Sequence, residues 1–245
     1  MKGIYRHLKH PGALYRTHMH ARATLLIVAL PFLFLLVFSR VAHFAARTLF
    51  ADVSASFLRM FLAYLFAAVF GWCAAVFFYR GRRALVALPV FDVLQSFPAL
   101  SALPVAVVLW GGSEITVIIF LAIEIIWPIF FSIVSSLKMI RRDWEEAIFI
   151  SGVAGWEYWR RFLIPVSIPG LITGSIIGLG QGWETLVAIE IIVGMRRGLG
   201  DFFAGFSHSP SITAMGIFGF LLAIFAINKL LWLPLLEWSH HALSE

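Results

Sequence analysis

Residues 146–165 read EAIFISGVAGWEYWRRFLIP and form the longest polar interruption in an otherwise apolar chain. Gly152 breaks the helical pattern, and an aromatic and basic stretch follows it up to Pro165, where a long apolar run resumes. The apolar runs on both sides are long enough to cross a lipid bilayer as helices. This stretch is therefore predicted to be a polar loop between two membrane spans.

The composition also indicates a membrane protein. Hydrophobic residues make up 61% of the 245 residues and charged residues only 13%, whereas soluble domains carry about 25% charged residues. The mean hydropathy is +0.91. The single cysteine, Cys73, excludes an internal disulfide framework and a zinc site built on several cysteines. The net charge of +6 comes from residues that flank apolar runs, so we expect it to set the membrane topology and expect no nucleic acid partner.

Six apolar runs predict an all-α, polytopic fold with six transmembrane helices in one domain over residues 1–245. Lipid offers no hydrogen-bond partners to the backbone, so each span is expected to be a helix. The third run contains Pro89, Pro98 and Pro104, which predict a break in it. The six runs cover about residues 23–38 (with an extension to 46), 60–78, 84–110, 115–137, 162–193 and 212–233.

Basic residues predict the orientation of these spans. They gather in the N-terminal segment 1–22, in the turn 80–83 and in the loop 138–161, and they are fewer in the intervening loops. Since lysine and arginine are enriched in cytoplasmic loops, these three regions are predicted to be cytoplasmic, with both termini on that side. We expect a multi-pass protein of a bacterial inner membrane.

The polar loop resembles the EAA loop of permease subunits of ATP-binding-cassette importers. The match rests on the spacing of Glu146, Ala147, Gly152 and Pro165, with Ile148 standing where that family has a second alanine. The resemblance implies that residues 143–161 couple the chain to a separate ATPase. An ordinary amphipathic interfacial helix is the alternative reading. The residues expected to couple to the ATPase are Glu146, Ala147, Gly152, Trp156, Arg160, Arg161 and Pro165.

A second resemblance concerns residues 91–104, FDVLQSFPALSALP. They are similar to the third span of nitrate, sulfonate and bicarbonate permeases, and in particular to the "anion transport, duplicated permease component" group. Trp127-Pro128, Gly182-Trp183 and Gly198-Leu199-Gly200 are similar too, and the resemblance extends over about residues 54–235. It implies transport of a small anion such as nitrate, a sulfonate, taurine or bicarbonate. That group is usually double-length, so a dimer of this single unit is expected.

Glycines recur every four residues in the fifth span, where a small-residue face permits close helix packing. Packing against span three or six, or against a second permease copy, fits this spacing equally well. The row consists of Gly170, Gly174, Gly178 and Gly182.

Polar residues inside the spans are the candidates for a pathway or gate, because such residues are costly in lipid. Bare carboxylates would repel an anion, so we expect the acidic ones to be bonded to Ser, Trp, backbone or basic partners, or to be protonated. The set is Asp92, Gln95, Pro98, Gln181, Glu184 and Glu190.

The sequence contains no HExxH, GxSxG, CxxC or Walker-type phosphate loop, so it predicts neither an enzyme nor a nucleotide or metal site in this chain. An intramembrane enzyme stays an alternative, with Ser96 and Ser101 near Asp92 but no histidine beside them. A non-transporting assembly subunit is another, and an osmolyte permease is the alternative within transport. The partners implied by the resemblance are two cytoplasmic ATPase subunits that bind ATP, a second permease copy, an extracytoplasmic solute-binding protein and the lipid bilayer.

Overall fold

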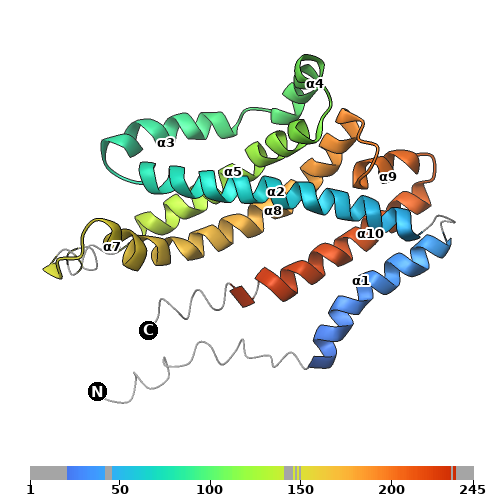
Figure 1. Cartoon of the computed structure of the whole chain (residues 1–245), viewed down its shortest axis with the longest axis horizontal. Coiled ribbons are helices and arrows are strands. Elements are labelled where there is room, and N and C mark those ends of the chain that lie inside the picture. The colour runs from blue at the N-terminus through green and yellow to red at the C-terminus, as the bar shows by residue number, and fades with distance from the viewer. Residues whose placement is uncertain are drawn as a thin grey trace.

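The computed structural model describes residues 21–41, 46–140, 146, 148, 150–232 and 234–235. Within those residues every regular element is helical (Figure 1). Two short π-helical turns, η2 (Trp159–Leu163) and η3 (Asn228–Trp232), accompany the α-helices. The α-helices are α1 (Ala21–Val41), α2 (Ala46–Phe78), α3 (Gly81–Gln95), α4 (Ala99–Trp110), α5 (Glu114–Lys138), α7 (Trp156–Tyr158), α8 (Ile164–Val193), α9 (Leu199–Gly205) and α10 (Pro210–Ile227).

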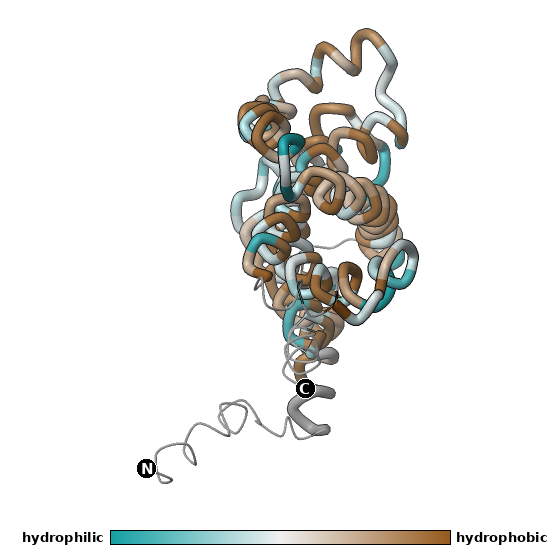
Figure 2. Tube along the Cα trace, turned by 90° about the vertical axis from the view of Figure 1, so that its left-hand side faces the viewer, coloured by the Kyte–Doolittle hydropathy of each residue, from teal (hydrophilic) through white to brown (hydrophobic). Residues whose placement is uncertain are grey.

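The long helices have the length and composition of membrane spans. Four segments qualify among the described residues: Arg47–Phe78, Glu114–Lys138, Trp156–Val193 and Pro210–Trp232. The bent pair α3 and α4 makes a fifth span if both halves cross together, and α1 holds a shorter apolar helix. Figure 2 shows hydrophobic residues along the helices and hydrophilic ones gathered in the turns. The predicted all-α membrane fold is confirmed, whereas the number six stays a prediction.

The centre of the molecule is the contact between α5 and α8, where the glycine row faces a row of buried isoleucines. A Cβ added at Gly174 would lie 2.6 Å from the Cα of Ile129, and one at Gly170 would lie 2.8 Å from the Cα of Ile133. Real Cβ atoms do not approach backbone so closely, so only glycine permits this helix separation. The row therefore packs on the fourth predicted span rather than on span three or six.

This finding also decides between the two kinds of interface considered for the row. The face that carries Gly170, Gly174 and Gly178 is covered by α5 of the same chain. It is therefore not available to a second permease copy. A contact between two copies needs another face of α8 or another helix.

The outer helices pack around this pair. On α2, Ala63, Ala67 and Ala75 are buried, and Gly71 lies against Ile129 of α5. Small residues on α2 thus let it approach α5 closely. Helix α1 packs on α10, where the rings of Phe34 and Phe218 meet edge to face at 5.4 Å.

Two features differ from the prediction, the start of α2 and the short helix α9, whereas the predicted break in the third span is confirmed. Helix α2 begins at Ala46 rather than at residue 60, because the polar residues in its first half are paired inside the protein instead of lying outside the membrane. The third span is two helices bent by 77°. Only Pro98 stands at that break, while Pro89 and Pro104 lie inside α3 and α4. The short helix α9 was not predicted.

Candidate functional site

The coupling segment (residues 146–165) lies at the same end of the bundle as the turn between α2 and α3 (Figure 1). Gly152 and Gly155 have φ of +72° and +61°, and a Cβ at either would meet open space. Both positions require glycine for their backbone conformation and not for packing. Glu146 is exposed, whereas Ala147 lies outside the described residues.

Several side chains of this segment are exposed, whereas Phe162 and Leu163 are buried. Trp156 is 73% exposed, and Arg160 and Arg161 are exposed beside it. Arg161 pairs with Glu157 at 3.1 Å in an exposed contact, a kind of pair worth only about 0–1 kcal/mol. Pro165 is half-buried in the first turn of α8. An exposed tryptophan followed by exposed arginines is typical of an interface that another protein covers.

The base of the segment is attached to both neighbouring helices. Trp72 of α2 donates from its ring nitrogen to Ser167 Oγ at 2.8 Å, and its ring meets that of Trp159 at 6.3 Å. Ser136 of α5 donates to the carbonyl oxygen of Val166 at 3.2 Å. The start of α8, directly after the segment, is therefore anchored to both α2 and α5.

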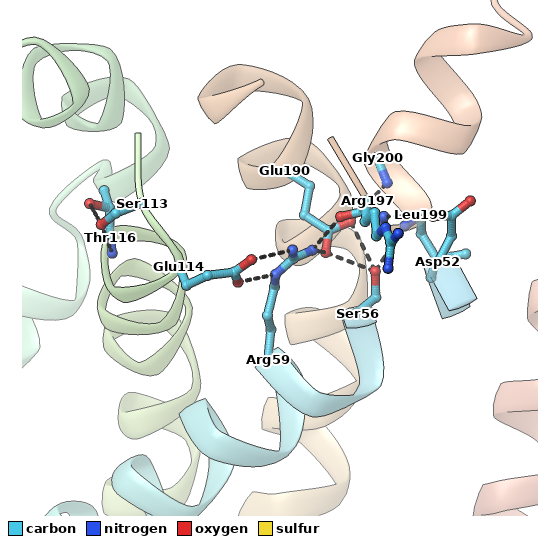
Figure 3. A network of polar contacts seen from close by, with 11 residues as sticks. Asp52, Ser56, Arg59, Ser113, Glu114, Thr116, Glu190, Arg197, Leu199 and Gly200 are labelled. Carbon is cyan, nitrogen blue, oxygen red and sulfur yellow. Dashed lines mark hydrogen bonds and ion pairs between the residues drawn. The ribbon is translucent and has the colours of Figure 1, made fainter. Parts of the chain in front are cut away.

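The opposite end of α8 holds a group of paired polar side chains around the buried Glu190, which we call the polar cluster (Ser56, Arg59, Glu114, Glu190 and the turn 197–200; Figure 3). The Arg59 guanidinium lies between two carboxylates. It donates to the two oxygens of Glu114 at 2.6 and 2.8 Å. It also donates to Glu190 and to the carbonyl oxygen of Arg197. One arginine of α2 thus joins α5, α8 and the turn before α9.

Glu190 is completely buried, and its two oxygens accept bonds from three groups. Besides Arg59, the donors are Ser56 Oγ at 2.7 Å and the Gly200 N–H at 2.8 Å. Ser56 in turn accepts the N–H of Leu199 at 2.8 Å. No buried side-chain nitrogen or oxygen among the described residues lacks a partner. Such complete pairing offsets the cost of removing the charges from water.

The turn that closes over this carboxylate needs two glycines. A Cβ at Gly198 would lie 2.5 Å from Glu190 Oε2, and one at Gly200 would lie 2.5 Å from Glu190 Cβ. Gly198 also has φ of +137° and donates its N–H to Asp52 Oδ1 at 3.3 Å. The Gly198-Leu199-Gly200 sequence is thus explained by the backbone that covers Glu190.

The structure places three of the predicted pathway residues at the break between α3 and α4. Gln95 donates to Asp92 Oδ1 at 2.6 Å, so the two side chains share one face, and Pro98 precedes α4. All three residues are exposed in the single chain. Interrupted backbone at membrane depth is tolerated where protein or water covers it.

The other three pathway candidates lie on α8 and differ among themselves. Gln181 and Glu184 are exposed, on a face that α5 does not cover. Glu190 is bonded to a serine, an arginine and a backbone N–H, as expected for an acidic residue within a membrane span. In this conformation it does not line a pathway, and its role in a gate stays a prediction.

The fold and the two ends of α8 can now be compared with known proteins. Residues 67–231 match the family described as "Binding-protein-dependent transport system inner membrane component". The chain belongs to this family. The matched region includes the broken span, the coupling segment and Glu190 together with its covering turn. The resemblance to importer permeases is therefore confirmed, and the members of this family are transport proteins.

Individual members of the family resemble the chain over most of its length. The nitrate import permease protein NrtB of Leptolyngbya laminosa is 29% identical over 71% of this chain and 65% of its own length. The taurine transport system permease protein TauC of Escherichia coli is 28% identical over 74% and 68%. The bicarbonate transport system permease protein CmpB of Synechococcus elongatus is 24% identical over 64% and 56%. The chain thus spans about two thirds or less of most of these relatives.

Sequence reasoning missed most of the permease's polar cluster. The predicted site residues did not include Ser56, Arg59 and Glu114. The predicted second and fourth spans begin just after Arg59 and Glu114, so these residues were placed outside the membrane helices. The available signal was Arg59, an arginine well inside a 33-residue apolar helix, which is a functional candidate by default. Among the described residues, no three His, Cys, Asp or Glu side chains lie together where they could hold a metal ion.

Proposed function

We propose that this chain is the membrane-spanning subunit of an ATP-binding-cassette importer that carries a small anion. The observation that carries the proposal is the continuity of α8. This 30-residue helix starts at the exposed coupling segment and ends at the buried polar cluster. It therefore provides a rigid connection between a surface suited to an ATPase and the opposite side of the membrane.

The coupling segment is proposed to dock on a cytoplasmic ATPase subunit. Exposed Trp156, with Arg160 and Arg161 beside it, has the composition of an interface anchor. The cation-rich turn between α2 and α3 lies at the same end, which supports a cytoplasmic position for both. In this proposal ATP is bound by the partner subunit, and this chain holds no cofactor.

The translocation pathway is proposed to form between two copies of the chain. Asp92 and Gln95 on α3, and Gln181 and Glu184 on α8, are polar side chains that the single chain leaves exposed. Polar groups in spans face the bundle interior or water rather than lipid. A second copy would enclose these faces, and an extracytoplasmic binding protein would deliver the solute to them.

The proposed solute is a small anion of the nitrate, taurine or bicarbonate type. The relatives named for these three solutes each match 64–74% of this chain. Glu190, which is fully buried near the far end of α8, is bonded to Arg59, Ser56 and the Gly200 N–H, so it presents no bare carboxylate to a solute. An unpaired carboxylate there would repel a negatively charged solute.

The test is reconstitution of the complex purified through this chain from its native membranes. Proteoliposomes are assayed for ATP-dependent uptake of nitrate, taurine and bicarbonate, with glycine betaine as the comparison solute. We expect an ATPase to copurify and one of the anions to be taken up. Uptake of glycine betaine alone would reject the anion while keeping the importer, and the absence of an ATPase would reject the importer.

Coupling is tested in the same vesicles with Gly152→Asp, which adds a side chain and a charge where the ATPase is proposed to dock. We expect substrate-stimulated ATP hydrolysis to be lost while the permease stays in the membrane. The control is Gly111→Asp at the other end of the molecule, where glycine is also exposed, has φ of +82° and a Cβ meets open space. Normal coupling in Gly152→Asp would contradict the docking site.

A further inference from the structure

A pocket beside the coupling segment has no role in the transport cycle described above. It has a volume of about 430 Å³ and lies between the α2–α3 turn and the base of the segment. The turn contributes Arg80, Arg82 and Arg83, and the segment contributes Tyr158 and Trp159. Residues far apart in the chain thus enclose one concave, positively charged site.

The charge of this pocket is not balanced from within its walls. Arg83 lies over the ring of Phe77 with 4.2 Å between the guanidinium carbon and the ring centroid. Among the residues that the structure describes, no carboxylate forms an ion pair with Arg82 or Arg83. The pocket lining contains no acidic residue. Planar guanidinium groups match the oxygens of a phosphate especially well.

The surroundings place the pocket at the level of lipid headgroups. The 33 residues of α2, at about 1.5 Å per residue, make it roughly 50 Å long, which exceeds the roughly 30 Å hydrocarbon core. Aromatic residues gather in the pocket at the C-terminal end of α2, as they do at membrane–water interfaces; they are Tyr79, Tyr158 and Trp159. This setting fits a position of the arginines at the level of lipid phosphates.

The surface next to the pocket is apolar, and this selects among possible anions. Phe77 is 53% exposed on α2, and Leu85 and Val86 are 77% and 70% exposed on the first turns of α3. These side chains continue from the arginines toward the hydrocarbon region. A lipid with an anionic headgroup and acyl chains fits both the arginine pocket and the apolar surface beside it. A soluble anion or an acidic protein surface fits only the arginine pocket.

We infer that this pocket binds the phosphate headgroup of an anionic phospholipid, with the acyl chains lying along Phe77, Leu85 and Val86. Basic pockets at the cytoplasmic ends of spans bind such headgroups. The bound lipid contacts Trp159, which belongs to the π-helical turn that leads from the coupling segment into α8. The site does not depend on which solute is carried.

The experiment is native mass spectrometry of the purified permease after incubation with vesicles of equal phosphatidylglycerol and phosphatidylcholine content. We expect the permease to retain phosphatidylglycerol in preference. Arg82→Gln with Arg83→Gln should weaken this retention by about tenfold or more, because both exposed guanidiniums contact the phosphate. The double variant Arg82→Lys with Arg83→Lys should retain more phosphatidylglycerol than the glutamine variant. It keeps both positive charges and loses only the planar guanidinium groups with their paired N–H donors.

The matched control is Lys138→Gln with Lys229→Gln, which removes the same charge from residues that do not line the pocket. We expect less than about a threefold change there. Equal loss in both double variants would mean general surface attraction and would overturn the pocket. Displacement of the lipid by millimolar inorganic phosphate would overturn the lipid as its occupant. Unchanged lipid retention with loss of the copurified ATPase would assign the arginines to that protein instead.

Discussion

The two ends of α8 are built in opposite ways. At one end, Glu190 is completely buried and receives bonds from three groups. At the other, Trp156 is 73% exposed and the described side-chain ion pair, between Arg161 and Glu157, is exposed to solvent. The first end is fixed by the chain itself, and the second keeps its side chains available.

This difference indicates where the molecule can move. Regions with few buried contacts open at low free energy, whereas a fully paired interior opens only at high cost. A partner that binds the coupling segment therefore meets little internal resistance there. On the proposed function, α8 and its contact with α5 would carry the resulting displacement to the polar cluster.

The largest effect is expected from breaking the polar cluster. Glu190→Gln replaces a buried acceptor of three bonds with an amide, and losing one partner of a buried ion pair costs about 3–5 kcal/mol.

Glu114→Gln is the matched control, because Glu114 pairs with the same arginine but its side chain is 59% exposed. We expect that variant to lose less than about 1 kcal/mol of unfolding free energy. Denaturation in detergent micelles measures both, and similar losses would remove the distinction between the two carboxylates.

A middle-sized effect is expected at the helix contact between the two ends. Gly174→Ala puts a Cβ 2.6 Å from the Ile129 Cα and 2.8 Å from the Pro128 oxygen. Overpacking of this kind costs about 1–3 kcal/mol. Gly180→Ala, on the same helix with no atom within 4 Å of the new Cβ, serves as the control. We expect it to be neutral or slightly stabilising in the same denaturation assay. A neutral Gly174→Ala would show that α5 and α8 can separate freely.

The smallest effect on stability is expected at the coupling segment. Trp156→Ala should change the unfolding free energy by less than about 0.5 kcal/mol, since the ring is exposed. On the proposed function it should weaken ATPase binding by about tenfold or more, because exposed tryptophans of this kind anchor interfaces.

The control for that variant is Trp110→Ala, whose ring is 70% exposed at the other end of the molecule. Titration of the copurified ATPase against both variants measures the difference. If the ATPase bound both tryptophan variants with equal affinity, the proposal that it docks at the coupling segment end of α8 would be contradicted.

The fold was largely predictable from the sequence, because long apolar runs fix most helix boundaries. The run predicted over 115–137 became α5, Glu114–Lys138, nearly unchanged. The start of α2 could not be found in this way, because Asp52, Ser56 and Arg59 look like a polar flank until their partners are known. The break in the third span was indicated by three prolines, yet the sequence could not tell which of them stands at the bend.

The site was predicted less completely, since its contacts join distant parts of the chain. Glu190 was singled out as a polar group within a span, but its partner Arg59 lies 131 residues away in sequence. The glycine row predicted a close contact without indicating its partner, because any helix with suitable side chains can fill the groove. The coupling residues rest on the family motif, and the structure adds that they lie on the surface.

The glycine contact also has a mechanical consequence. Helix α8 is 30 residues long, roughly 45 Å at about 1.5 Å per residue. Gly174 and Gly178 touch α5 near its middle, where neither has a side chain to interlock. A rod that pivots by about 5° at such a point moves each end by about 2 Å, a typical size for helix shifts in switching proteins. Because the two ends of a pivoting rod travel in opposite directions, an inward push at one membrane surface becomes an outward swing at the other.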